Sequence, residues 1–138
     1  LQEHLLNKVR FEPTKADVDA TIKDPEDDFI EKAILLVEEN IQNPDFGIEN
    51  MVDELYMSQS TLYRKIKSLT GLSLTAFIRS IRLKKAAQII LTSNTKLSHI
   101  AYEVGFNDYK YFKKSFVDQF DCLPSEYRGI KKPKIKQG

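Results

Sequence analysis

An internal repeat limits what this chain can fold into. Residues 48–71 and 97–121 each read as two short stretches of helical apolar spacing joined by a tight turn. Before the turn, apolar positions recur at an offset of 49, and these are Met51, Val52 and Leu55 against Ile100, Ala101 and Val104. After the turn the offset is 50, and the pairs are Leu62, Ile66 and Phe77 against Phe112, Phe116 and Tyr127. The chain is therefore expected to build one helical hairpin twice, with the second turn one residue longer.

The two turns differ at one position. Gly105 lies in the second turn, where closely packed helices often need a positive φ, and glycine adopts that φ at no steric cost. The first copy has Tyr56 at that place, so we expect its turn to be built differently. Ser58 and Asp108 are good N-caps for the helices that follow. Those second helices are expected over residues 58–69 and 108–120.

Each second helix has an apolar face and a face rich in hydrogen-bond donors. The apolar faces are expected to bury Leu62, Ile66 and Leu69 in the first copy and Phe112, Phe116 and Phe120 in the second. The outer face of the first carries Gln59, Ser60, Tyr63, Arg64 and Lys67, and that of the second carries Tyr109, Lys110, Lys113 and Lys114. Such donors suit a helix that lies in a DNA major groove, where it meets base edges and phosphates.

Two further helices frame the first hairpin. Asp24, followed by Pro25 and three acids, predicts a helix start, and Asn43-Pro44 predicts the end of that helix. Its buried stripe is expected to be Phe29, Ala33, Leu36, Val37 and Ile41. A long helix is expected from about Leu74 to Leu91, with an exposed basic surface of Arg79, Arg82, Lys84 and Lys85. This helix would be a spacer of about 27 Å. That length is compatible with placing the second helices of the two hairpins, here called the recognition helices, about 34 Å apart in successive major grooves.

The charge is divided along the chain. Residues 1–50 hold 5 Lys or Arg and 13 Asp or Glu, and residues 51–138 hold 16 and 7, although the net charge is only +1. The basic part coincides with the repeats. This division is typical of a domain whose repeated half meets a polyanion, although ordinary surface solubility gives the same pattern.

Other classes of site find little support in the residues. His4 and His99 have no cysteine or acid pair at ligand spacing, and no nucleophile and base, phosphate loop or metal set is visible, so we expect no enzyme, no cofactor and no small-molecule ligand. No apolar run approaches the roughly 18 to 20 residues of a membrane span, and no signal peptide is visible. With a single cysteine, a reducing, cytoplasmic setting is the default.

The hairpins and the segments that close them resemble a known family. TG-x-S and then F-I-R follow the first, A-Y-E-V-G-F-x-D and then L-P-S-E-Y-R mark the second, and this arrangement over about residues 29 to 129 resembles the DNA-binding domain of AraC/XylS-type transcription regulators. The resemblance implies an all-α, homeodomain-like fold of about seven helices, with two helix-turn-helix units on one long central helix. It also implies specificity residues, which fall on Ser60, Tyr63, Arg64, Tyr109, Lys110 and Lys114. Gln59, Lys67 and Lys113 are then phosphate contacts.

The ends of the chain suggest its context. Residues 1–28, read as one end of a helix and a linker, resemble the connection after the receiver domain of hybrid two-component regulators in bacteria, and residues 130–138 read as a basic disordered tail. A free-standing regulator remains the alternative. We expect double-stranded DNA as the partner, a preceding receiver domain and dimerisation in the full-length protein, and RNA polymerase as a further candidate. The alternative function is a protein-interaction module that contacts polymerase or a receiver.

Overall fold

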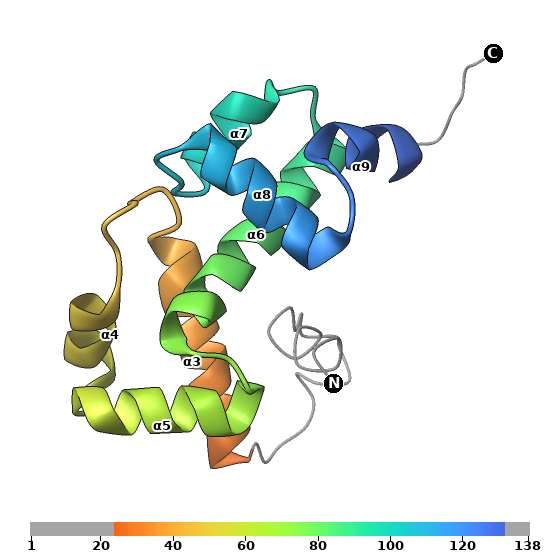
Figure 1. Ribbon diagram of the computed structural model, residues 1–138. Helices are drawn as coiled ribbons and strands as arrows, with labels where there is room; N and C mark the ends of the chain where they lie inside the picture. The colour runs from red at the N-terminus through yellow and green to blue at the C-terminus, as the bar shows by residue number, and fades with distance from the viewer. Residues whose placement is uncertain (1–23, 132–138) are drawn as a thin grey trace. The chain divides into compact units, whose positions relative to one another are not determined.

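All secondary structure in the described part of the chain is helical (Figure 1). The computed structural model describes residues 24–131. Its helices are α3 (Pro25–Glu39), α4 (Ile48–Leu55), α5 (Gln59–Thr70), α6 (Leu74–Thr92), α7 (Leu97–Glu103), α8 (Tyr109–Phe120) and α9 (Pro124–Lys131). The predicted all-α class is confirmed. The expected leader helix and linker up to residue 23, and the tail from residue 132, lie outside the described residues.

The described residues form two compact units. One holds residues 24–40 and 46–81, and the other holds residues 41–45 and 82–131. Each unit contains one predicted hairpin, α4 with α5 or α7 with α8. Helix α6 has 19 residues, as the sequence predicted to within one residue, and it contributes to both units. Its role as a spacer between recognition helices stays a prediction.

Helix α3 supports the first hairpin. It begins as predicted, because Asp24 accepts a hydrogen bond from the Glu26 N–H at 3.0 Å and Pro25 occupies the first turn. It ends at Glu39 and not at Asn43-Pro44. The predicted stripe is wrong in part, since Ile30 and Ile34 are buried while Leu36 is only half-buried. Contacts with both α4 and α5 widen the buried face of α3 beyond one narrow stripe.

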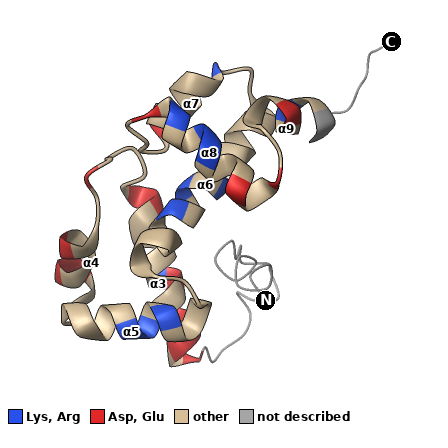
Figure 2. Ribbon diagram, viewed as in Figure 1, with Lys and Arg blue, Asp and Glu red and all other residues tan. Residues whose placement is uncertain are grey.

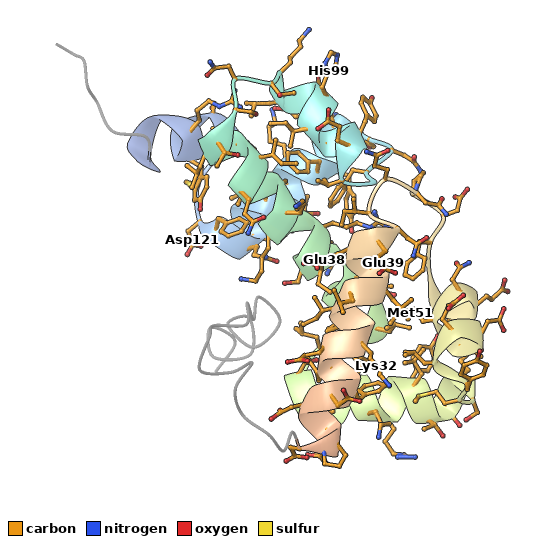
Figure 3. All side chains as sticks on the ribbon, turned by 180° about the vertical axis from the view of Figure 1, so that it is seen from behind. Lys32, Glu38, Glu39, Met51, His99 and Asp121 are labelled. Atoms are coloured by element: carbon orange, nitrogen blue, oxygen red, sulfur yellow. The ribbon has the colours of Figure 1, made fainter. Side chains whose placement is uncertain are left out.

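The core of the first unit forms where α3, α4 and α5 meet. Met51, Leu62, Ile66 and Phe77 have no exposed surface, and Met51 extends from α4 toward the interior in Figure 3. Lys65 closes the edge, with its Nζ 5.0 Å from the centre of the Phe29 ring. This contact joins α5 to α3 by packing the lysine charge against an aromatic face.

The core of the second unit is aromatic. Phe112 and Phe116 of α8 have no exposed surface, and their ring centres lie 5.8 Å apart. Phe116 also meets Tyr127 of α9 edge to face, with centres 5.5 Å apart. The predicted ridge is therefore confirmed at its first two positions, whereas Phe120 is only half-buried.

The two hairpin turns are closed by the same hydrogen bond. The Met57 N–H donates to the Val52 carbonyl at 3.4 Å, and the Phe106 N–H donates to the Ala101 carbonyl at 2.9 Å. In each case the residue before the donor has a positive φ, +55° at Tyr56 and +94° at Gly105. A left-handed residue with this bond is the usual end of a helix. The expectation of a differently built first turn is therefore wrong, although the extra residue of the second turn is confirmed.

The segments after the recognition helices repeat as well. Gly71 and Asp121 both have a positive φ, and the N–H of each donates to the carbonyl four residues earlier at 2.8 Å. Helices α6 and α9 begin three residues after them. Aspartate tolerates this conformation better than most residues. The sequence match between the closing segments therefore reflects a shared backbone conformation.

Arg82 is not on the surface, which corrects the predicted basic face of α6. Its side chain is 6% exposed, and the guanidinium donates to the carbonyls of Ile41 at 2.6 Å, Val104 at 2.8 Å and Asn43 at 2.9 Å. All four residues belong to the second unit. Burial lowers the pKa of Arg82. Its hydrogen bonds satisfy the carbonyl of Val104, the C-cap of α7, where a helix leaves acceptors without partners, and two carbonyls in the loop after α3.

The guanidinium also explains the glycine at position 105. A Cβ on Gly105 would lie 1.5 Å from Arg82 Nη1 and 2.5 Å from the Ile41 carbonyl oxygen. Glycine is therefore required here for space as well as for its φ. At Tyr56 the residue is 92% exposed, so space is not limiting there. Only the positive φ disfavours a residue other than glycine at this position.

Replacing Arg82 with methionine should lower the free energy of unfolding by about 3 kcal/mol, because it leaves buried carbonyls without donors. Urea unfolding followed by circular dichroism measures this loss. Lys85→Met is the matched control, since Lys85 is exposed on the same helix. An equal effect of both substitutions would contradict the role given to the Arg82 hydrogen bonds.

Replacing Tyr56 with glycine should raise the free energy of unfolding by about 1 kcal/mol, since glycine adopts the left-handed conformation without a clash at Cβ. The same unfolding experiment measures the gain. Tyr56→Phe keeps the Cβ and should leave stability unchanged. A less stable glycine variant would mean that the tyrosine ring contributes more than the backbone strain removes.

Candidate nucleic-acid interface

The first recognition helix is held by its cap and its apolar face. The Thr61 N–H donates to Ser58 Oγ at 3.2 Å, which satisfies one of the free donors at the start of α5. Leu62, Ile66 and Thr70 have no exposed surface, so Thr70 takes part of the role predicted for Leu69, which is half-buried. The opposite face is thereby fixed toward solvent. All five predicted residues on it are exposed, namely Gln59, Ser60, Tyr63, Arg64 and Lys67.

The exposed side chains of α5 differ in whether they form hydrogen bonds within the described part of the chain. Gln59 Nε2 donates to the Tyr63 hydroxyl at 3.1 Å, and Lys67 Nζ donates to the Gly71 carbonyl at 3.1 Å. No described residue forms an ion pair or hydrogen bond with the Arg64 side chain. Since α5 contains no acidic residue, no side chain of the helix itself offsets the charges of Arg64 and Lys67 on its exposed face.

The second recognition helix is built in the same way. Asp108 caps it as predicted, since its Oδ1 accepts from the Lys110 N–H at 2.9 Å. Lys110, Lys113 and Lys114 are exposed, as expected for the outer face. Lys114 forms an ion pair with Asp118 at 3.9 Å, and both side chains stay largely exposed. An ion pair this exposed contributes little to stability.

Tyr109 was predicted to project outward, and this prediction is wrong in part. The residue is half-buried and packs against the core of the second unit, with its ring stacked 5.9 Å from that of Phe112. Lys113 Nζ lies 5.8 Å from the centre of the Tyr109 ring. Tyr111, which the sequence analysis did not single out, is 47% exposed in the first turn of α8. The repeat gave no signal for it, because its equivalent in the first copy, Thr61, is not a predicted site residue either.

The helices of each hairpin differ in charge, and in the first hairpin they have opposite signs (Figure 2). Basic residues mark α5 and α8, while α4 carries Glu49, Asp53 and Glu54, all exposed. In a hairpin that approaches DNA, the second helix enters the groove and the first crosses the backbone. The basic residues therefore lie on the helix of each hairpin that would enter a groove.

Neither a metal site nor a membrane span stands out in residues 24–131. No group of three or more His, Cys, Asp or Glu residues there could hold a metal ion. His99 is exposed on α7, and Figure 3 shows it at the outer side of that helix. None of the described helices combines the length and the apolar character needed to cross a bilayer.

Comparison with known proteins decides the family. A family model described as a helix-turn-helix domain matches residues 51–130, which contain the whole second hairpin and all but the first three residues of the first. The chain belongs to this family, the AraC-type DNA-binding domains. Domains of this family are sequence-specific DNA-binding parts of transcription regulators and are not enzymes. The predicted resemblance is thus confirmed.

Three similar proteins place this AraC-type domain in context. "Histidine kinase P4" of Formosa agariphila is 36% identical over 130 residues, which span 93% of this chain but only 10% of the kinase. The C-terminal domain of the two-component response regulator yesN from Fusobacterium nucleatum is 27% identical, with a TM-score of 0.65 over 73% of this chain and 98% of that chain. The DNA-binding domain of AdpA, a global transcriptional factor solved with a target DNA, shares the fold at 24% identity, with a TM-score of 0.69 over 84% of this chain and all of that chain.

Removing the N-cap of either recognition helix should lower the free energy of unfolding of the AraC-type domain by about 1 kcal/mol. Ser58→Ala and Asp108→Ala each leave amide donors in a first helical turn without an acceptor, so hydrogen exchange at Thr61 and Lys110, respectively, should accelerate. Ser68→Ala, a substitution at an exposed position in the last turn of α5, is the control and should change neither quantity. Loss of protection over the whole domain without a local effect would contradict the capping roles.

Proposed function

We propose that this domain binds double-stranded DNA by inserting residues 58–69 and 108–120, the two capped recognition helices, into successive major grooves. One observation supports this more than any other: each hairpin buries the apolar face of its second helix and leaves a basic, donor-rich face exposed. A free face of this kind matches the requirements of groove binding, in which lysines and arginines neutralise phosphates and a few side chains reach base edges.

Arg64 is the strongest candidate for a base contact. Its guanidinium has no partner among the described residues, and this group can bond bidentately to guanine O6 and N7 or clamp a phosphate. We assign base contacts to Ser60 and Tyr63 as well. Phosphate contacts fall on Gln59, Lys67 and Lys113. Tyr109, Lys110 and Lys114 complete the proposed interface on α8.

The domain is proposed to be the output part of a two-component regulator that acts in the bacterial cytoplasm, where its DNA is. Two similarities support this: the match to a histidine kinase extends over nearly the whole chain, and a similar solved domain is the C-terminal part of a response regulator. Residues 29–129 would be the DNA-binding domain, with residues 1–28 as the connection to a receiver and residues 130–138 as a basic tail. Phosphorylation of the receiver would then drive dimerisation, so that paired domains occupy repeated sites.

A second function, contact with a protein such as RNA polymerase or a receiver, is favoured by one feature. Helix α4 exposes three acids, Glu49, Asp53 and Glu54, beside a basic recognition helix. An acidic surface of this kind suits a basic protein partner. Salt dependence separates the two functions, because release of counterions from DNA makes affinity fall steeply with salt.

Replacing Arg64 with alanine should weaken specific DNA binding by about 1 to 3 kcal/mol and relax the base preference at the contacted position. The measurement is selection from a randomised double-stranded pool with sequencing, followed by titration at two salt concentrations. Lys32→Ala is the control, because Lys32 is an exposed lysine of α3 that already pairs with Asp28.

Equal loss on specific and random DNA would contradict base reading by Arg64 and leave it as a phosphate contact. If the folded wild-type domain showed no affinity that depends on salt, groove binding itself would be wrong and the protein-contact function would take its place.

A further inference from the structure

We infer that the two hairpins divide the work of DNA recognition, with α5 reading bases and α8 holding phosphates. This inference rests on the proposed function, and it departs from the expectation that both recognition helices read bases through equivalent positions. The evidence is a comparison of the outer faces of α5 and α8, position by position at the offset of 50 residues.

Helix α5 presents the side chains that discriminate between bases. Arg64 has a planar fork of donors and no acidic neighbour on the helix, so nothing in the described chain competes with a bidentate contact. Ser60 is exposed one turn earlier, where a recognition helix begins to meet base edges. Lys67 is bonded to the Gly71 carbonyl and so lies toward the end of the helix.

At the positions equivalent to Arg64 and Ser60, helix α8 carries side chains of another kind. Lys114 stands at the position of Arg64, and Lys110 stands at the position of Ser60. A lysine ammonium is a compact point charge that lacks the planar fork of arginine, so its charge attracts any phosphate while its contact with a base is less constrained in geometry than that of arginine. Tyr109 stands at the position of Gln59, but its ring is committed to the core through Phe112.

The neighbours of the lysines add to this difference. Asp118 lies 3.9 Å from Lys114, at the position where α5 has the uncharged Ser68. Lys113 lies over the ring of Tyr109. Both ammonium groups thus have a contact on their own helix, and Asp118 places a negative charge on the outer face that Arg64 does not have beside it. Asp118 therefore limits the attraction of α8 for phosphate.

The matched pair Arg64→Ala and Lys114→Ala tests the division, because the two residues occupy equivalent positions of the repeat and both are exposed. Each variant and the wild type are taken through selection from a randomised double-stranded pool and titrated against specific and random DNA at several salt concentrations. Circular dichroism first establishes that all three are folded.

Arg64→Ala should remove the preference at its base pairs by about tenfold or more. Lys114→Ala should leave every base preference unchanged, weaken specific and random DNA equally, and reduce the salt slope by about 1. Asp118→Asn should strengthen binding to both kinds of DNA by a few-fold, because it removes the negative charge beside Lys114.

Loss of preference at a second block of base pairs in Lys114→Ala, or in Lys110→Ala as a second variant, would overturn the inference, since α8 would then read bases. A folded wild type that bound no DNA at any salt concentration would overturn the proposed function, and the inference with it. A wild type that binds with salt dependence and selects two blocks, both unaffected by Arg64→Ala, would overturn the division alone.

Discussion

A backbone hydrogen bond across five residues aims the recognition helix in each unit. In both hairpins a left-handed residue reverses the chain, and the next N–H donates back to the preceding helix, from Met57 to Val52 and from Phe106 to Ala101. The helix that follows can then start only one to two residues later, at the Ser58 or Asp108 cap. The direction of α5 relative to α4, and of α8 relative to α7, therefore follows from one conformation. The side of α5 and of α8 that is exposed to solvent therefore depends on this turn conformation.

Each unit meets that conformation with a different residue because the surroundings differ. In the second unit the space beside the turn is filled by the Arg82 guanidinium, so only glycine fits at position 105. The same guanidinium satisfies the carbonyls of Ile41, Asn43 and Val104, which ties the turn to α6 and to the segment after α3. A buried charge is unfavourable without such bonds, and three good acceptors supply them. In the first unit the turn is open, and Tyr56 takes the left-handed conformation with its ring exposed.

Repetition of the backbone does not make the two surfaces equal. The cores of both units require apolar residues at Leu62 and Ile66 or at Phe112 and Phe116, and this requirement keeps the hairpins alike. The outer faces carry no such requirement and therefore differ. Helix α5 exposes arginine, serine and amide groups, whereas the equivalent positions of α8 hold lysines and a tyrosine that packs on the core. A family of DNA-binding domains can vary these outer residues without disturbing the fold, because contacts with DNA draw on side chains that the core does not use.

The sequence by itself determined the repeat, the helical class, and the start of both recognition helices at Ser58 and Asp108. These features depend on apolar periodicity and on capping groups within three residues, which are local. Tertiary structure decided the burial of Arg82, the left-handed Tyr56, the half-burial of Tyr109 and the burial of Ile30 and Ile34. The carbonyls that hold Arg82 lie 22 to 41 residues away in the chain. Local pattern leaves such partners open, because a basic residue on a helix looks the same whether its acceptors are water or the ends of other helices.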